Sequence, residues 1–206
     1  MKAAVIIFHR DIGKYPVSWV DQCFASVRDQ TFKNFDVFEF DYGGTFCHSY
    51  YKSTFDSFEL LTHAHAHNHL LDWVFSMDYD CAFNVNIDDY YALDRFEKQT
   101  VAIRDGADVV SSNFIRFNHE GQPNVRYLEF HKLDPVKEAK KGHNIIAHPV
   151  CCYSRKFWLN CTRLNPAEIP QDDFELWKRS YGKFNFVILP DYLLYQRIHE
   201  FNISKK

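Results

Sequence analysis

The sequence predicts an α/β protein with one mixed, mostly parallel central sheet flanked by helices. Short apolar runs alternate with stretches whose apolar residues recur at helical spacing, which is typical of strand–helix units. The chain has 206 residues, a length that fits one domain with a sizeable core. Hydrophobic residues make up 46% and charged residues 25%, which are the proportions of a folded globular protein.

The expected elements of the first half follow this alternation. An apolar strand at 3–8 precedes a helix at 17–28, in which apolar side chains are spaced for one buried face. Residues 35–40 alternate as a half-buried strand does, and the turn after them contains two glycines. The remaining expected elements are a helix at 55–75, a strand at 83–87, a helix at 93–104 and a strand at 108–113.

The second half is less regular. We expect strands at 125–130 and 145–153, followed by helices at 155–160 and 172–181. Residues 132–142 are polar and rich in lysine, so we expect a surface loop there, with a lid over a substrate as the alternative.

Composition narrows the classes of function. A formal charge of −3 and a pI near 6.4 argue against a general nucleic-acid-binding protein, which normally presents a basic face. The six cysteines form no C-x-x-C pair, which predicts free thiols in a reducing compartment. No apolar run is long enough for a signal-peptide core or a membrane span. We therefore expect a cytosolic protein, in the host cytosol if its source is a virus, and nothing indicates its oligomeric state.

Two adjacent carboxylates end the strand expected at 83–87. The segment FNVNIDDYY places Asp88 and Asp89 at the carboxyl end of that strand, where open α/β sheets bind their ligands. Mg²⁺ is usually held in such a place by one or two carboxylates plus substrate phosphates. The pair therefore favours a cation and a nucleoside diphosphate, although the same residues could simply cap the helix that begins near Leu93.

Several short segments match, in order, the motifs of one known family. They are VIIFHR (5–10), SVRDQTFKNF (26–35), FDYG (40–43), NIDD (86–89), QDDFELW (171–177) and YQRIH (195–199). Together they resemble the nucleotide-sugar glycosyltransferases of the GT-A fold, in particular the large family 2 group. The second segment, which is similar to the family's S-V-x-x-Q-T, is the most specific match, and the resemblance covers nearly the whole chain.

The resemblance implies one Rossmann-like GT-A domain over residues 1–206, a UDP-sugar donor and Mn²⁺ or Mg²⁺. Asp88 would hold the metal, with Asp89 as a second metal ligand or as a group that orients the ligand. His199 would be a further metal ligand or would contact the diphosphate. Asp41 would accept the N3 hydrogen of uracil, which cytosine lacks. The full set of residues expected at the donor is Phe8, His9, Arg10, Asp41, His67, Asn86 and Asp88.

For catalysis, the resemblance implies that Asp173, or its neighbour Asp172, is the general base that deprotonates a sugar hydroxyl. In-line attack would then invert the anomeric centre of a hexose or deoxyhexose passed to a growing glycan. The two residues also follow Pro170 as a helix N-terminus would, and acidic side chains are favourable there. A helix cap and a general base are compatible roles.

The chain departs from the family at some positions. Asn86 replaces the first aspartate of the D-x-D metal motif, and an amide supplies no charge to a metal. A literal D-x-D at 78–80 precedes the strand instead of ending it, so we rank it lower. Alternating histidines at 63, 65, 67 and 69 could pair at i,i+4 for zinc, but no third ligand is apparent and helix histidines are the simpler interpretation.

Two other functions stay open. A nucleotidyltransferase that makes sugar nucleotides would show a glycine-rich basic phosphate loop, of which HRDIGK is a poor version. A catalytically inactive UDP-sugar-binding module is suggested by Asn86. The chain could also be one module of a longer glycan-building polypeptide, similar to small transferases of bacterial polysaccharide clusters and of large viruses.

Overall fold

The strands of the protein form one mixed sheet in a computed structural model that describes residues 1–44, 53–118, 125–200 and 202. Their order is β3-β2-β1-β4-β8-β6-β9-β5, and β7 pairs with β6. The strands are β1 (Ala3–His9), β2 (Phe35–Asp41), β3 (Ser53–Ser57), β4 (Cys81–Asn86), β5 (Tyr90–Tyr91), β6 (Val109–Asn118), β7 (Arg126–Leu128), β8 (Cys152–Ser154) and β9 (Phe186–Ile198).

The parallel ladders of this sheet are its long ones. They join β1 to β2 and β4, β2 to β3, and β6 to β9. Each antiparallel ladder contains only two or three residue pairs. The predicted class, a mixed and mostly parallel sheet flanked by helices, is confirmed.

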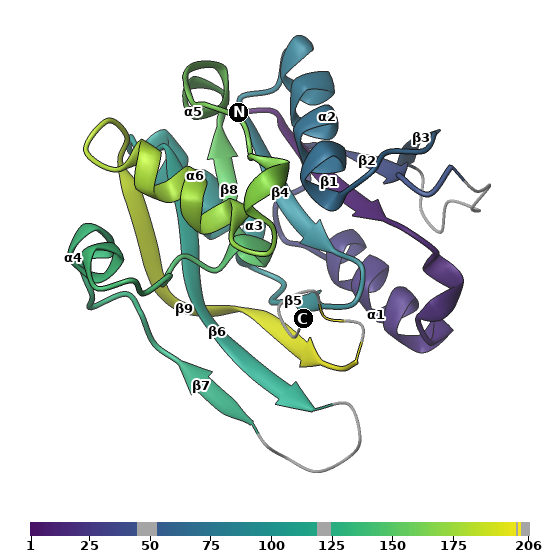
Figure 1. Cartoon of the computed structure of the whole chain (residues 1–206). Coiled ribbons are helices and arrows are strands. Elements are labelled where there is room, and N and C mark those ends of the chain that lie inside the picture. Colours follow the sequence, from purple (N-terminus) through teal and green to yellow (C-terminus); the bar gives the residue numbers. More distant parts are fainter. Residues whose placement is uncertain (45–52, 119–124, 201, 203–206) are drawn as a thin grey trace.

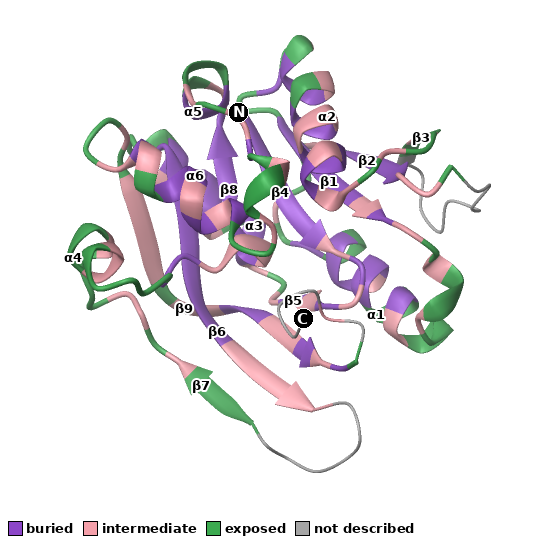
Figure 2. Ribbon diagram, in the orientation of Figure 1, coloured by how far each residue is buried: buried purple, intermediate pink, exposed green. Residues whose placement is uncertain are grey.

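Helices cover both faces of the sheet (Figure 1). Ala3, Val5 and Ile7 of β1 pack in one core cluster with α1 and α3, whereas Ala4 and Ile6 pack in the other with α2, α5 and α6. Figure 2 shows the central strands as the most buried part of the chain. The helices are α1 (Val17–Arg28), α2 (His63–Ser76), α3 (Arg95–Arg104), α4 (Pro135–Lys140), α5 (Arg155–Asn160) and α6 (Asp172–Ser180), with 3-10 turns η1 (Ile12–Lys14), η2 (His148–Val150) and η3 (Pro166–Glu168).

The parallel register decides where polar side chains gather. His9 at the end of β1 lies opposite Asp41 at the end of β2, and Phe8 lies opposite Asn86 at the end of β4. The carboxyl ends of these three strands therefore share one edge of the sheet, where the sequence predicts the ligand site.

Gln30, in the segment that matches the family most specifically, has a structural role. Its side chain is completely buried, and its Nε2 donates to the carbonyls of Ser26 (2.9 Å) and Ala92 (2.7 Å). Its Oε1 accepts from the N–H of Phe96 at 2.9 Å, in the first turn of α3. One amide thus joins the end of α1 to the chain entering α3.

Some predicted boundaries are wrong. The helix expected at 55–75 begins only at His63, because Thr62 caps it and residues 53–57 pair with β2 as β3. The strand expected at 145–153 is reduced to β8, because the residues before it form η2, where Pro149 offers no N–H to a ladder.

Two further segments differ from expectation. The predicted loop at 132–142 contains α4, because the side chain of Asp134 accepts from the N–H groups of Val136 and Lys137 and Pro135 suits the first turn. The 13-residue strand β9 has no counterpart among the predicted strands, because only residues 195–199 of this region match a motif of the family.

Thiols and membrane spans can be checked for the described ranges. The five cysteines within them form no disulfide, and Cys47 lies outside the described residues. No helix in these ranges is long and apolar enough to span a bilayer.

Candidate functional site

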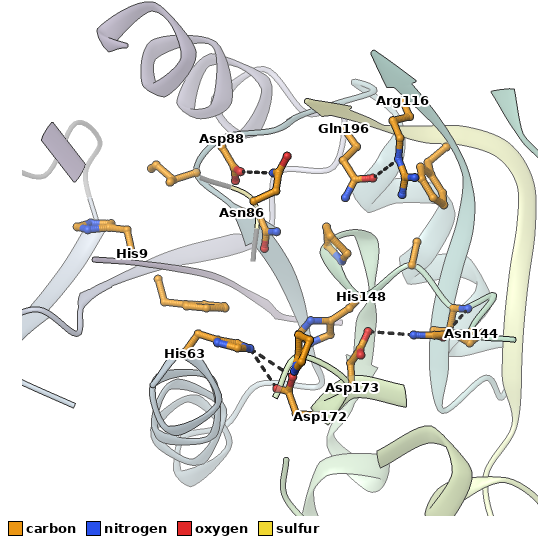
Figure 3. A pocket seen from close by; sticks show the side chains of 18 of the residues that line it. His9, His63, Asn86, Asp88, Arg116, Asn144, His148, Asp172, Asp173 and Gln196 are labelled. Atoms are coloured by element: carbon orange, nitrogen blue, oxygen red, sulfur yellow. Dashed lines mark hydrogen bonds and ion pairs between the residues drawn. The ribbon is translucent and has the colours of Figure 1, made fainter. Parts of the chain in front are cut away.

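A cavity of about 540 Å³ opens at the shared carboxyl edge of β1, β2 and β4 (Figure 3). Its walls come from distant parts of the sequence. They include Phe8 and His9 at the end of β1, Arg10 after it, Tyr42 after β2, Asn86 at the end of β4, Asp88 after it, Arg116 on β6, Asn144 and His148 before β8, Asp172 and Asp173 at the start of α6, and Gln196 on β9.

Asp88 lines one wall of the cavity and contacts two residues that follow β9. Its Oδ2 lies 2.8 Å from Nε2 of His199, and Nδ2 of Asn202 lies 3.4 Å from the same oxygen. The His199 ring is held by its packing against Tyr15 and Trp19. The predicted metal ligands Asp88 and His199 are thus brought together.

Asp89, the third predicted metal ligand, makes a different contact. Its side chain is buried and is not part of the cavity wall, and its Oδ1 accepts from the backbone N–H of Arg197 at 2.9 Å. Arg197 in turn donates to the carbonyl of Asp88 at 2.6 Å. Burial, and then the neighbouring charge of Asp88, raise the pKa of Asp89 well above its ordinary value. Asp89 therefore ties the turn after β4 to β9.

The Asp88–His199 pair fits a divalent cation of the manganese type. Carboxylate oxygen suits Mg²⁺ and Mn²⁺, and imidazole suits transition metals. Cations at phosphate sites usually take one or two protein ligands plus substrate phosphates. Across the described ranges, no cluster of three or more His, Cys, Asp or Glu side chains forms a candidate metal site.

Asp172 and Asp173 lie on the opposite side of the cavity in Figure 3. Both open α6, where the helix dipole favours acidic side chains. Nε2 of His63 lies 3.3 Å from Oδ1 and 3.2 Å from Oδ2 of Asp172. Burial acts to raise the pKa of Asp172, but the hydrogen bond and charge of His63 leave it below the ordinary value. Asp172 is thus a paired carboxylate.

Asp173 is held differently. Its Oδ2 accepts from Nδ2 of Asn144 at 3.2 Å, and its Oδ1 accepts from the N–H of Phe174 at 2.7 Å. Burial raises the pKa of Asp173, and the charge of His148 and these hydrogen bonds only partly oppose that rise. A cavity carboxylate with a raised pKa is suited to accept a proton.

Around the strand ends, Phe8, Arg10 and Tyr42 form an aromatic and cationic wall. The Arg10 guanidinium lies 5.9 Å from the centre of the Tyr42 ring, and the Phe8 ring centre lies 6.4 Å from it. A side chain at Gly43 would bring its Cβ to 3.1 Å from side-chain atoms of both Arg10 and Asp41, so these neighbours would have to shift to admit it.

Two predicted donor residues do not line the cavity. Asp41 is fully buried, where its Oδ1 accepts from the N–H of Gly43 at 2.8 Å and lies 4.0 Å from Nδ1 of His9. His67 is also buried, packed edge-on against Phe8 and His148, and burial lowers its pKa well below the usual range.

The remaining alternating histidines have separate contacts. His63 pairs with Asp172, His65 shares a 2.8 Å hydrogen bond with Thr62, and His69 packs against Phe40 and Phe58. The literal D-x-D at 78–80 precedes β4, where Asp80 accepts from the N–H of Lys2.

Sequence reasoning missed Arg116, Gln196 and Asn144, and it treated His63 only as part of a zinc pattern. Arg116 and Gln196 meet because β6 and β9 pair in register. No local motif announces such a pairing. For His63 a signal existed in the sequence: its i,i+4 spacing with His67 places both rings on one face of α2.

The same arrangement of elements occurs in known transferases. S. aureus TarS in complex with UDP-GlcNAc superposes with a TM-score of 0.67 at 16% identity, over 100% of this chain and 61% of that one. The mannosyltransferase PcManGT from Pyrobaculum calidifontis, in complex with GDP-Man and Mn²⁺, gives 0.64 at 11% identity, over 99% and 59%. The chain has the fold of the GT-A glycosyltransferases.

A protein from STIV also matches, with a TM-score of 0.55 at 16% identity, over 97% of this chain and 87% of that one. The chain spans about 37% to 61% of the TarS chains it matches. The sequence matches no protein-family model and no curated protein sequence.

Proposed function

We propose that the protein is a metal-dependent glycosyltransferase that moves a hexose or deoxyhexose from a UDP-sugar to a hydroxyl of a glycan. One observation carries the proposal. A single cavity at the strand ends has Asp88, which contacts the buried His199, on one side and the Asp172–Asp173 pair on the opposite side. This is the arrangement expected where a leaving diphosphate and an attacking hydroxyl approach one sugar from opposite directions.

The nucleotide lies against Phe8, Arg10 and Tyr42. Aromatic rings offer surfaces for a base, and Arg10 offers charge for a phosphate. Asn86 lines the cavity beside Asp88, so its amide can hydrogen-bond a ribose hydroxyl. We keep UDP as the first candidate, although Asp41, the residue predicted to recognise uracil, is fully buried behind this wall and does not line the cavity. The solved relatives bind either UDP-GlcNAc or GDP-Man, so the base is a point for experiment.

The metal would be held by Asp88 and His199, with Asp89 fixing the turn that carries Asp88. When bound, Mn²⁺ or Mg²⁺ supplies a Lewis acid that stabilises negative charge on the leaving diphosphate. His199 packs against Tyr15 and Trp19 and lies beside the carboxylate of Asp88, so it would ligate the cation next to Asp88 or orient that carboxylate.

Asp173 is the proposed general base. The acceptor oxygen bonds to the anomeric carbon, the bond from that carbon to the diphosphate oxygen breaks, and the hydroxyl proton passes to Asp173. Attack on the face opposite the leaving group inverts the anomeric centre. Asp172 stays paired with His63 and holds the start of α6 in position.

The test is release of nucleoside diphosphate from a panel of UDP-, GDP- and dTDP-sugars, with and without Mn²⁺. We expect metal-dependent release from at least one UDP-sugar. Binding of UDP without turnover of any donor would favour the inactive binding module suggested by Asn86. Absence of both binding and release across the panel would contradict the proposed function.

A further inference from the structure

Arg116 places a positive charge in a third part of the cavity. It lies on β6, beside Gln196 of β9 and apart from both Asp88 and Asp173 (Figure 3). Its Nε donates to Oε1 of Gln196 at 3.0 Å, and its guanidinium carbon lies 5.6 Å from the centre of the Phe114 ring. The neutral amide and the ring fix the plane of the guanidinium without neutralising it.

This charge has no close acidic partner. In the part of the chain that the structure describes, no carboxylate forms an ion pair with Arg116. Burial and the charge of Arg126 lower the pKa of Arg116, and the more distant Asp89 acts in the opposite direction. Arginine nevertheless stays protonated in proteins. A partly buried cation without a partner is costly unless a ligand supplies the opposite charge.

The position of Arg116 separates it from the proposed donor phosphates. The nucleotide wall has its own cation, Arg10, and Asp88 lies beside Asn86, apart from Arg116 (Figure 3). The residues that line the cavity around Arg116 are instead Phe114 on β6, Leu128 on β7, Phe130 after β7 and Gln196 on β9. This wall is left for the acceptor.

We propose that the acceptor of the transfer carries a phosphate or carboxylate group, which Arg116 binds while Gln196 orients the guanidinium. That this ligand is the acceptor rests on the proposed function, but binding of an anion at Arg116 can be measured without turnover. A planar guanidinium can form paired hydrogen bonds to either oxyanion, which is why the two chemistries are named together. Apolar surface beside it would contact the sugar ring or an adjoining chain.

The experiment measures binding of small sugars to the protein by calorimetry or NMR titration, with UDP and Mn²⁺ added first to fill the donor site. The probes are glucose 1-phosphate, methyl glucuronide and neutral methyl glucoside. We expect the wild type to bind an anionic probe about 10- to 100-fold more tightly than the neutral one, as charged hydrogen bonds allow. The stronger anionic probe identifies phosphate or carboxylate.

Matched variants locate the effect. Arg116→Gln should abolish the preference for the anionic probe while leaving UDP binding unchanged. Arg126→Gln removes the same charge from the exposed cross-strand neighbour and should keep the preference. Gln196→Glu should weaken anion binding, because the new carboxylate pairs with Arg116. Arg116→Lys retains the charge and covers the case in which the glutamine variant does not fold; it should keep a reduced preference.

Several results would overturn the inference. Equal binding of charged and neutral probes would remove the anion site. If Arg126→Gln loses the preference for the anionic probe as fully as Arg116→Gln does, the effect comes from general surface charge. If Arg116→Gln also loses UDP binding, Arg116 belongs to the donor site. If UDP itself does not bind, the proposed function fails, and titration of the same probes into the protein alone still decides whether Arg116 binds anions.

Discussion

Nε2 of His199 lies 2.8 Å from Oδ2 of Asp88, although 111 residues separate them in the chain. The contact joins the turn after β4 to the segment that follows β9. Nδ2 of Asn202 makes a longer contact of 3.4 Å to the same oxygen. Arg197, on β9, donates from its guanidinium to the backbone carbonyl of Asp88. Residues Arg197, His199 and Asn202 therefore fix Asp88 in place at the cavity wall.

Replacing His199 tests this relationship. We expect His199→Ala to raise the Mn²⁺ concentration needed for half-maximal UDP release by about 10- to 100-fold, since a group that ligates the metal or orients its ligand is lost. The measurement is a metal titration of donor hydrolysis. His143→Ala, on the exposed chain after α4, is the matched control and should leave the titration unchanged.

Asp173→Asn tests the general base. The amide keeps the shape of the side chain but cannot take a proton, so we expect UDP binding to persist and transfer to fall by about 10²- to 10⁴-fold. Rates are compared under acceptor saturation. A variant that transfers at the wild-type rate would remove Asp173 as the base.

The same substitution has a stability consequence. Because burial raises the folded-state pKa of Asp173 above 3.8, its ionised form is disfavoured by folding. The penalty is absent below the unfolded pKa and appears as pH rises through the folded one. We therefore expect Asp173→Asn to be more stable than wild type toward urea at pH 7, with the difference shrinking as the pH falls from the folded-state pKa toward the unfolded-state pKa and absent below the latter.

Asn144→Ala shifts the pH dependence of transfer. The Asn144 amide donates to Asp173 and so favours its ionised form; without it, the pKa of Asp173 rises further. Since transfer needs the ionised carboxylate, the acid limb of kcat/KM should move to higher pH. The check is a pH profile of both proteins, and superimposable acid limbs would exclude the contact from tuning the base.

Gln30→Leu tests the buried amide. It removes three hydrogen bonds and leaves the N–H of Phe96 without its acceptor, whereas the carbonyl of Ala92 keeps its bond from the N–H of Arg95. We expect a loss of about 3 kcal/mol in the free energy of unfolding, from the cost of buried unpaired polar groups. Urea denaturation measures it. As a control, Thr31→Val at the neighbouring position removes an exposed hydrogen bond to Glu97. It should lower the free energy of unfolding by less than about 1 kcal/mol.

The sequence predicted the fold where periodicity and side-chain type agree. The continuous apolar run of β1 and the spaced apolar residues of α1 yielded correct elements, because β1 is buried on both faces and α1 on one. The boundaries failed where distant pairing decides, as for β3, which forms on the edge of β2, and β9, which pairs with β6.

The site was predictable to a similar extent. Asp88, Asp172 and Asp173 lie at element ends, which sequence patterns mark, and the structure places all three on one cavity. Arg116 and Asn144 reach it only through tertiary contacts, so no local pattern could select them. Asp89 and Asp41 lie at strand ends as expected, but both side chains are buried, and a backbone N–H donates to one oxygen of each.

The measurement that tests the central claim most directly is calorimetric titration of UDP into wild type, Asp88→Asn and Asp80→Asn, with and without saturating Mn²⁺. Asp80 precedes β4, so it is the matched control. We predict that Mn²⁺ tightens UDP binding by about 10-fold or more in wild type and Asp80→Asn, and that Asp88→Asn loses this gain. UDP affinity that ignores Mn²⁺ in wild type, or that is unchanged in Asp88→Asn, would contradict a nucleotide–metal site at this cavity.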